Sequence, residues 1–214
     1  ISIIVYMSYK GKKSLKNVFG SKEGYNLYAD IYNNNVVYLN TFEENTVLKL
    51  MGNLTNKKAL DIGCGTGRLI QDLINSGADV TAIDVSEEMV KIAKNKFRTV
   101  NISVADVENL PFEDNSFDFV VASFLIVHLK TLTKAFDEIY RVLKDGGEFL
   151  VTNINQRKAP KIELESGERI VIKSYYHRPE DVIKALEYSF FKIEKEEFIR
   201  EGKTWINQII KVRK

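Results

Sequence analysis

A glycine-rich loop at residues 63–67 constrains this chain more than any other feature. The loop reads Gly-Cys-Gly-Thr-Gly; the short apolar run 59–62 precedes it, and a helix-like pattern starts near Arg68. Glycines at 63, 65 and 67 permit positive φ angles and let a ligand approach the backbone, while the next helix offers free N–H groups. The chain therefore predicts a nucleotide-type loop between a strand and a helix.

Asp61, two residues before the loop, indicates which kind of ligand the loop binds. Its carboxylate would repel a pyrophosphate, whereas an ammonium or a sulfonium group would be attracted. S-adenosylmethionine carries both of these cations and no phosphate. We therefore expect an adenosyl sulfonium ligand in place of a phosphorylated one.

Length and composition favour a single α/β core. The chain has 214 residues, of which 44% are hydrophobic and 28% charged, which is ordinary for a globular domain. The net charge of +2 is too small to require a nucleic acid, although it does not exclude one. Cys64 is the single cysteine, so internal disulfides and cysteine metal sites are excluded and a cytoplasmic location is expected.

The first residues predict neither secretion nor a membrane span. Segment 1–7 is apolar but far too short to cross a bilayer, and no basic residue precedes it as in a signal peptide. We expect Met7 to lie close to the natural start, with residues 1–6 extraneous, and we interpret 1–24 as an N-terminal tail.

From residue 57 onward, strand and helix patterns alternate. The expected strands are 59–62, 80–83, 102–104, 117–122 and 148–152, and the helices are 68–75, 86–98 and 131–143, with Ser86 as an N-cap. Repeated strand–helix–strand units imply parallel pairing with right-handed crossovers. We predict an α/β fold with a doubly wound, mostly parallel, seven-stranded sheet and helices on both faces.

The two ends of the chain complete this domain, which we expect to span 25–214. Segment 25–53 predicts a cap of two helices, and 156–178 contains a hairpin insert formed by 161–164 and 169–173. Pro179 opens a helix through Tyr188. Strands 192–199 and 205–212 flank a Glu201-Gly202 turn, which makes the last strand antiparallel.

Four features in order resemble the class I S-adenosylmethionine-dependent methyltransferases. They are the 60–67 loop, Asp84 at the end of the second strand, Asp106 after the third, and the Leu-Pro-Phe-Glu-Asp-Asn-Ser-Phe-Asp run at 110–118. The resemblance covers about 25–153 and is greatest to the branch of quinone-biosynthesis and biotin-pathway enzymes. It implies methyl transfer from S-adenosylmethionine, leaving S-adenosylhomocysteine, to a small-molecule or carrier-linked acceptor.

The resemblance also implies a cofactor site. Asp61, Gly63 and Gly65 would lie against the methionine part, Asp84 would accept the ribose hydroxyls, and Asp106 would face the adenine amino group. Segment 25–33 resembles the family's N-terminal lid, with Asn26 and Asn33 in place of two acids. The full expected set is Tyr25, Tyr32, Asp61, Gly63, Cys64, Gly65, Gly67, Asp84, Val85, Met89, Asp106, Val107 and Ser123.

The acceptor side is expected after the fourth parallel strand. His128 is the candidate base, with a structural helix-start residue as the alternative, and Phe124, Tyr175 and Tyr176 are candidate acceptor contacts. His177 is expected to be exposed, and no metal site is expected. Nucleic acid is disfavoured as an acceptor because the chain has Ala-Ser-Phe-Leu at 122–125, where many nucleic-acid and glutamine methyltransferases carry an Asn-Pro-Pro-aromatic motif.

Other interpretations stay open. Asp61 could cap a turn and Asp84 could N-cap a helix. A nicotinamide-dependent dehydrogenase would also place an acid near Asp84, but its loop is Gly-x-Gly-x-x-Gly, and Asp61 is unsuited to a pyrophosphate. A third possibility is a protein that binds S-adenosylmethionine without turnover.

Overall fold

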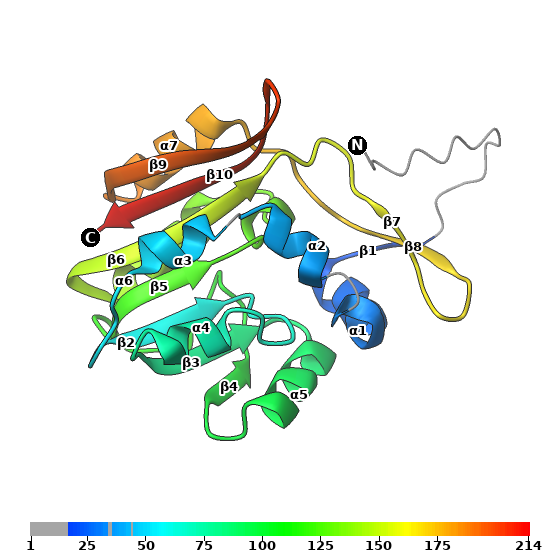
Figure 1. The fold of residues 1–214 in the computed structure, drawn as a ribbon, viewed down its shortest axis with the longest axis horizontal. Coiled ribbons are helices and arrows are strands. Elements are labelled where there is room, and N and C mark those ends of the chain that lie inside the picture. The colour runs from blue at the N-terminus through cyan, green and yellow to red at the C-terminus, as the bar shows by residue number, and fades with distance from the viewer. Residues whose placement is uncertain (1–16, 34–35, 44) are drawn as a thin grey trace.

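The computed structural model describes residues 17–33, 36–43 and 45–214, so the expectations about Met7 and residues 1–6 lie outside the described residues. Its main feature is a seven-stranded sheet in the order β4-β3-β2-β5-β6-β10-β9 (Figure 1). The first five strands of this order pair in parallel, and β10 is antiparallel to both β6 and β9. The predicted sheet with an antiparallel last strand is confirmed. The strands are β2 (Lys58–Ile62), β3 (Asp79–Asp84), β4 (Asn101–Val104), β5 (Phe117–Ala122), β6 (Leu143–Ile154), β9 (Lys192–Glu201) and β10 (Thr204–Arg213).

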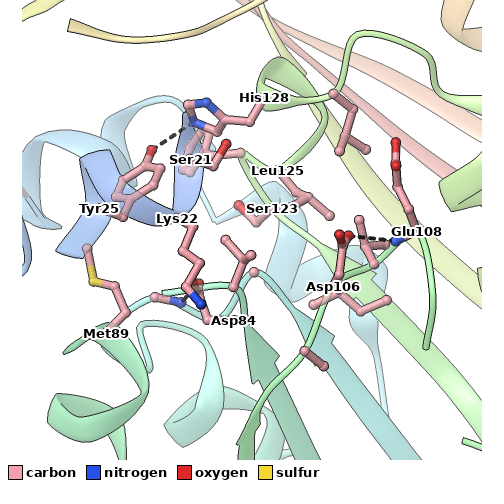
Figure 2. A pocket seen from close by; sticks show the side chains of 18 of the residues that line it. Ser21, Lys22, Tyr25, Asp84, Met89, Asp106, Glu108, Ser123, Leu125 and His128 are labelled. Atoms are coloured by element: carbon pink, nitrogen blue, oxygen red, sulfur yellow. Dashed lines mark hydrogen bonds between the residues drawn. The ribbon is translucent and has the colours of Figure 1, made fainter. Parts of the chain in front are cut away.

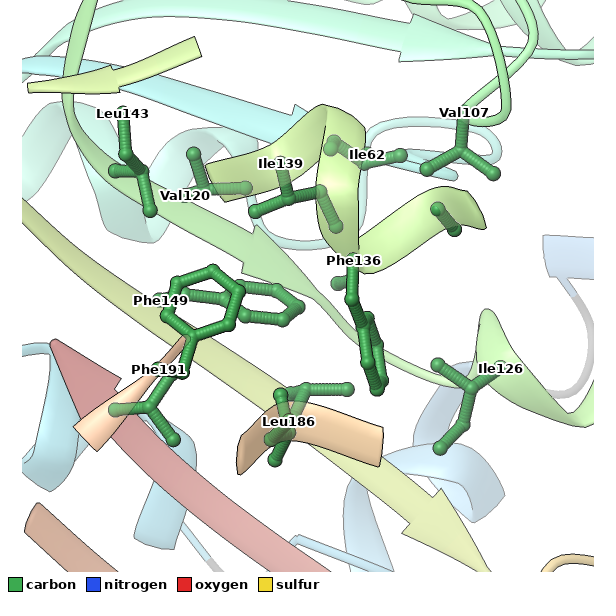
Figure 3. Close-up of a cluster of buried hydrophobic side chains, with 14 of the residues drawn as sticks. Ile62, Val107, Val120, Ile126, Phe136, Ile139, Leu143, Phe149, Leu186 and Phe191 are labelled. Carbon is green, nitrogen blue, oxygen red and sulfur yellow. The ribbon is translucent and has the colours of Figure 1, made fainter. Parts of the chain in front are cut away.

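Helices cover both faces of this sheet, as predicted. Helices α6 (Thr133–Val142) and α7 (Pro179–Tyr188) contribute to one buried cluster, whose centre holds Phe136, Phe149 and Phe191 (Figure 3). Helices α3 (Thr46–Met51), α4 (Ile70–Asn75) and α5 (Glu87–Lys96) contribute to the other. Successive strand residues face opposite sides, so Leu60 belongs to the first cluster and Ala59 to the second.

Several element boundaries differ from the predicted ones for local reasons. Helix α4 begins at Ile70 instead of Arg68, because residues 65–69 still form turns around Gly67, whose φ is 89°. Helix α5 ends at Lys96 instead of Arg98, because Phe97 leaves the helical region at φ −122°, ψ 70°. Strand β6 begins at Leu143, ahead of the expected 148, and accommodates Gly146 at φ 75° near a register shift against β5.

The N-terminal cap contains three helices, one more than the sequence predicts. They are α1 (Ser21–Tyr32), α2 (Val36–Thr41) and α3. Helix α1 begins before Tyr25, because Gly20 with extended backbone precedes its first turn and its carbonyl accepts from the N–H of Gly24. Gly24 lies where a Cβ atom would come 2.7 Å from the side chain of Ile172, so a close approach to the hairpin insert favours glycine there.

The hairpin insert forms a small second sheet with the N-terminal segment. Strands β7 (Lys161–Glu163) and β8 (Arg169–Ile172) pair antiparallel as predicted, and β1 (Val18–Phe19) pairs parallel with β8. Strand β1 falls in the segment interpreted as a tail, and its partner lies far away in the chain. Figure 1 shows this sheet projecting beside α1. Within the described residues, no helix is long and apolar enough to cross a bilayer.

Candidate functional site

A cavity of about 430 Å³ opens at the carboxyl ends of the parallel strands. Ile62 ends β2, Asp84 ends β3, and Ser123 follows β5, and all three line the cavity. Helix α1 contributes Tyr25 from the opposite side (Figure 2). Crevices outside the carboxyl ends of parallel strands are where open α/β sheets bind ligands, so this cavity is the candidate site.

The glycine loop forms one wall of the cavity. The N–H groups of Gly63 and Cys64 both donate to the carbonyl of Ile83, at 2.8 and 3.0 Å, which turns the chain sharply after β2. Gly63 and Gly65 have φ angles of 71° and 55°, and a Cβ atom on Gly63 would lie 2.9 Å from the side chain of Leu125. Side chains at these positions would therefore strain the loop and narrow the cavity.

Asp84 joins two loops beneath the cavity. Its Oδ2 accepts from the N–H of Gly65 and its Oδ1 from the N–H of Ser86, each at 2.8 Å. Burial raises the pKa of Asp84, while these backbone donors act in the opposite direction. Ser86, not Asp84, is the N-cap of α5, because its Oγ accepts from the N–H of Met89. A carboxylate has about four acceptor positions, so both oxygens can each accept another donor.

Asp61 lies deeper, beside a smaller second cavity that Arg68 and Ser123 also line. Its side chain is buried, and its Oδ2 has no hydrogen-bond partner among the described residues. Burial raises its pKa to about 7; Arg68 counteracts this shift, and Asp84 and Glu43 add to it. Buried polar atoms without a partner are rare, and a cationic ligand group would supply the missing donor.

An ion pair that the sequence did not reveal borders this second cavity. The Arg68 guanidinium contacts Glu43 at 2.8 and 3.1 Å, and both side chains are nearly buried. Ser123 accepts from Arg68 at 2.6 Å and donates to Glu43. The pair connects the segment after α2 to the glycine loop and the end of β5. No local signal could have indicated it, since the two charges are far apart in the chain.

Two asparagines fasten α1 over the cavity. Asn26 Oδ1 accepts from Ser86 Oγ at 2.7 Å and from the Glu88 N–H at 3.3 Å. Asn33 Oδ1 accepts from Thr66 Oγ1 at 2.6 Å and from Lys96 at 3.1 Å. These are the positions where the resembled family carries acids, and here both amides hold the loops next to Asp84 and Gly65.

His128 ends the short 3-10 helix η2 (Ile126–His128) and lines the cavity. Its Nε2 lies 2.8 Å from the hydroxyl of Tyr25 (Figure 2). Its Nδ1 lies 3.0 Å from the carbonyl oxygen of Lys173. Burial lowers the pKa of His128. His177 was expected to be exposed, but it is half-buried, and its Nε2 donates to the carbonyls of Ile126 and Leu129. Hydrogen bonds therefore attach the segment that follows β8 to η2 and the residue after it.

Most of the expected site residues surround the main cavity. Gly67 and Tyr176 line neither cavity: Gly67 packs against Phe97, and Tyr176 contacts Arg157 and Trp205. Burial raises the pKa of the Cys64 thiol well above its usual value. The main cavity is lined by Tyr25, Tyr32, Gly63, Gly65, Asp84, Val85, Met89, Asp106, Val107, Ser123, Phe124, His128 and Tyr175, and the second by Tyr32, Asp61, Gly63, Cys64, Ser123 and Phe124.

Other lining residues were missed by the sequence reasoning. Leu125 and Leu129 lie close to His128 in the chain, and their apolar side chains also line the main cavity. Only their nearness to His128 in the sequence could have indicated them. The remaining missed residues are Ser21, Lys22, Glu23, Ile62, Ala105, Glu108 and Lys130 around the main cavity, and Arg68 and Leu69 at the second. Within the described part of the chain, no group of His, Cys, Asp or Glu side chains could hold a metal ion.

The parallel sheet, the glycine loop and the cavity at the carboxyl ends of the strands form a doubly wound α/β architecture of the kind that binds nucleotides. Residues 60–151 match the family model described as a methyltransferase domain. These residues are thus similar to methyltransferase domains.

Curated relatives and a solved structure show further similarity. A demethylmenaquinone methyltransferase of Staphylococcus aureus is 38% identical over 120 residues, covering 53% of this chain and 50% of that protein. A sterol 4-C-methyltransferase of Caenorhabditis elegans is 36% identical over 105 residues, covering 46% and 31%. The chain thus spans about half or less of these two relatives. The PH0226 protein of Pyrococcus horikoshii has a similar fold, with a TM-score of 0.70 at 24% identity, covering 91% of this chain and 99% of that structure.

Proposed function

We propose that this protein transfers a methyl group from S-adenosylmethionine to a small-molecule or carrier-linked acceptor. The observation that carries the proposal is the pair of carboxylates at adjacent strand ends, one of which, Asp61, has a buried oxygen without a partner. When bound, S-adenosylmethionine supplies an electrophilic methyl group on a sulfonium sulfur. A phosphorylated ligand would meet both carboxylates with like charge.

The residues present fit this cofactor. Asp61 would accept from the ammonium group of the methionine part, with Gly63 and Gly65 against its backbone. Asp84 would accept from the two ribose hydroxyls through the acceptor positions that Gly65 and Ser86 leave open. Asp106 would face the adenine amino group, with Val85, Met89 and Val107 packed around the ring; all four line the main cavity.

The protein would align the acceptor with the methyl group, exclude water and accept one proton from the acceptor. Phe124, Leu125 and Leu129 give the acceptor end of the cavity an apolar wall, which keeps water from the reacting atoms. A base is needed where the acceptor arrives protonated, and His128 is the proposed proton acceptor. Tyr175 is a further proposed acceptor contact, because it lines the same cavity.

Relatives whose names refer to demethylmenaquinone and to sterol support a small-molecule acceptor. Tyr176 lies outside the cavity, stacked under Arg157, so it would contact only a part of the acceptor that extends from the cavity. A cytoplasmic location stays a prediction.

Calorimetry tests the proposal with three ligands. We expect saturable binding of S-adenosylmethionine and S-adenosylhomocysteine, and none of NAD. Folded protein that takes up neither adenosyl compound would refute the proposal, and uptake of NAD would favour the dehydrogenase. Transfer of a labelled methyl group to any member of an acceptor panel would then exclude a protein that only binds the cofactor.

A further inference from the structure

The hydrogen bonds of His128 determine which ring nitrogen carries its proton. A backbone carbonyl can only accept, so the Nδ1 atom 3.0 Å from the oxygen of Lys173 must carry a hydrogen. Burial lowers the pKa of the ring, which favours the neutral form. Neutral imidazole has one donor and one acceptor nitrogen. Nε2 is therefore the acceptor, and the hydroxyl of Tyr25, 2.8 Å away, donates to it.

The hydroxyl oxygen of Tyr25 keeps acceptor capacity for a ligand. Burial raises the pKa of Tyr25 well above its usual value, and Tyr32 and Asp84 add to this shift, so the phenol holds its proton. Its one hydrogen points to His128, and a phenolic oxygen can also accept. Tyr25 and His128 both line the main cavity, with rings edge to face at 5.1 Å between centroids.

Other aromatic and charged groups surround this pair. Tyr32 and Tyr28 pack on the ring of Tyr25. Asp84 lies below, where its two oxygens accept from backbone N–H groups. The remaining charged or titratable side chains that line the cavity are Lys22, Glu23, Asp106, Glu108, Lys130 and Tyr175.

We propose that Tyr25 is the catalytic residue that touches the acceptor, and that it passes the acceptor's proton to His128. The hydrogen bond from Tyr25 to Nε2 of His128, fixed by the Lys173 carbonyl, carries this inference. It rests on the proposed methyltransferase function and names the acceptor class: a neutral molecule whose nucleophile carries its proton on oxygen, such as a phenol or an enol.

The step balances without any further reactant. A bond forms between the acceptor's nucleophilic atom and the methyl carbon, while the methyl–sulfur bond breaks and its electron pair stays on sulfur. The acceptor's O–H proton moves to the Tyr25 oxygen as the Tyr25 proton moves to Nε2 of His128. The imidazolium that results loses its proton to solvent before the next turnover. A phenol or enol that attacks through carbon loses its hydroxyl proton by the same route.

Nitrogen NMR of the imidazole rings tests the direction of the hydrogen bond. The chain has only two histidines, and the structure gives them opposite tautomers: Nδ1–H for His128, and Nε2–H for His177, whose Nε2 donates to two carbonyls. His177 is thus an internal reference, and His128→Gln assigns the signals. A neutral His128 with its hydrogen on Nε2 would overturn the inference, because Tyr25 could not then donate to it.

A coloured phenol tests the proton transfer itself. The probe is 4-nitrophenol, whose anion absorbs visible light, added with sinefungin, a cofactor analogue with an amine at the reacting position. We expect wild-type protein to lower the pKa of the bound probe, and Tyr25→Phe and His128→Gln to lower it less. Tyr28→Phe is the matched control, because it removes a hydroxyl from the same aromatic group without lining the cavity.

The outcomes separate this inference from the proposed function. If wild-type protein binds S-adenosylhomocysteine but does not bind the phenol, or if all variants lower the pKa of the bound phenol equally, the relay is wrong and the methyltransferase stands. If Tyr25→Phe weakens S-adenosylhomocysteine binding about tenfold or more, Tyr25 is a cofactor contact and the relay is also wrong. If the wild type binds no adenosyl compound, the proposed function itself fails.

Discussion

At the scale of single residues, two carboxylates set the charge of the cavity, and they differ in how well they are satisfied. Asp84 accepts one backbone N–H on each oxygen. Asp61 keeps one oxygen without a partner among the described residues. This difference implies different roles: Asp84 also holds two loops together, whereas the Oδ2 atom of Asp61 is available to a ligand. Substitutions at the two positions should therefore give different results.

Asp84→Ala should weaken binding of S-adenosylhomocysteine by about 1.5–3 kcal/mol, because two charge-assisted hydrogen bonds to the ribose are lost. Calorimetry measures the affinity. Asp79→Ala is the control, since Asp79 is an exposed carboxylate at the opposite end of the same strand. Unchanged affinity in Asp84→Ala would contradict the proposal that Asp84 binds the ribose hydroxyls. A thermal melt of each variant checks that the loops stay folded.

Asp61 should make cofactor binding depend on pH. Its pKa in the folded protein is about 7, and only the ionised form can hold an ammonium group, so the affinity for S-adenosylhomocysteine should rise as the pH increases through 7. The same shift affects stability in the opposite direction. Because the folded state holds this proton more tightly than the unfolded state, the contribution of Asp61 to stability falls as the pH rises from the ordinary pKa of 3.8 to the folded-state pKa of about 7.

Asp61→Asn is the matched variant for this titration, because it keeps the shape and removes the charge. Above neutral pH, its affinity for S-adenosylhomocysteine should be lower than that of the wild type. Its affinity should not change with pH over the range in which the wild-type affinity changes. Arg68, Asp84 and Glu43 act on the Asp61 charge and remain in the variant. A pH dependence that persists in Asp61→Asn would assign the titration to one of these neighbours.

At the scale of elements, the cavity depends on how α1 is attached. Asn26 and Asn33 bond this helix to the N-cap of α5 and to the glycine loop. On its other side, Gly24 packs against Ile172 of β8. Helix α1 is thus held between the cofactor loops and the hairpin insert, so that opening the site requires it to leave both.

Asn26→Ala should loosen α1 without unfolding the sheet. The variant loses the acceptor for Ser86 Oγ and for the Glu88 N–H, which costs about 1–3 kcal/mol of local stability. Hydrogen exchange of amides in α1 should accelerate, while exchange in β2 and β5 should not change. Leu27→Ala in the same helix is the control, because Leu27 is 47% exposed. Equal exchange in both variants would show that Asn26 does not hold the helix.

Element by element, local patterns predicted the parallel strands, α7 and the hairpin insert. Apolar runs, caps and turns are encoded within a few residues, as at Ser86 and Pro179. The pairing of β1 with β8 was not predictable, because it joins Val18 to Val171. The same is true of the Asn26 and Asn33 contacts and of the outward position of Tyr176. Such pairs depend on three-dimensional packing that no local window contains.

At the scale of the whole molecule, the buried ion pair between Arg68 and Glu43 couples the N-terminal cap to the sheet. The side chains of these two residues are 10% and 5% exposed, and Ser123 bonds to both. Charges buried to this extent need their partners, because taking an ion out of water is costly. The pair therefore contributes more to one specific arrangement of the cap than to stability in general.

Arg68→Met should lower the free energy of unfolding by about 3–5 kcal/mol, because it leaves Glu43 buried without its counter-charge. The double variant Arg68→Met with Glu43→Leu should recover most of this loss, since no unpaired charge remains. Denaturant unfolding followed by circular dichroism measures both values. A double variant as unstable as Arg68→Met alone would show that packing around Arg68, and not charge pairing, is the source of the effect.

His128 is a single ring shared by three stretches of chain: its own 3-10 helix, the helix that carries Tyr25, and the backbone at Lys173. The acceptor end of the main cavity is complete only when all three segments are in place. Local opening of any one of these segments removes a contact of His128. We therefore expect methyl transfer to be lost at a lower temperature than binding of S-adenosylmethionine.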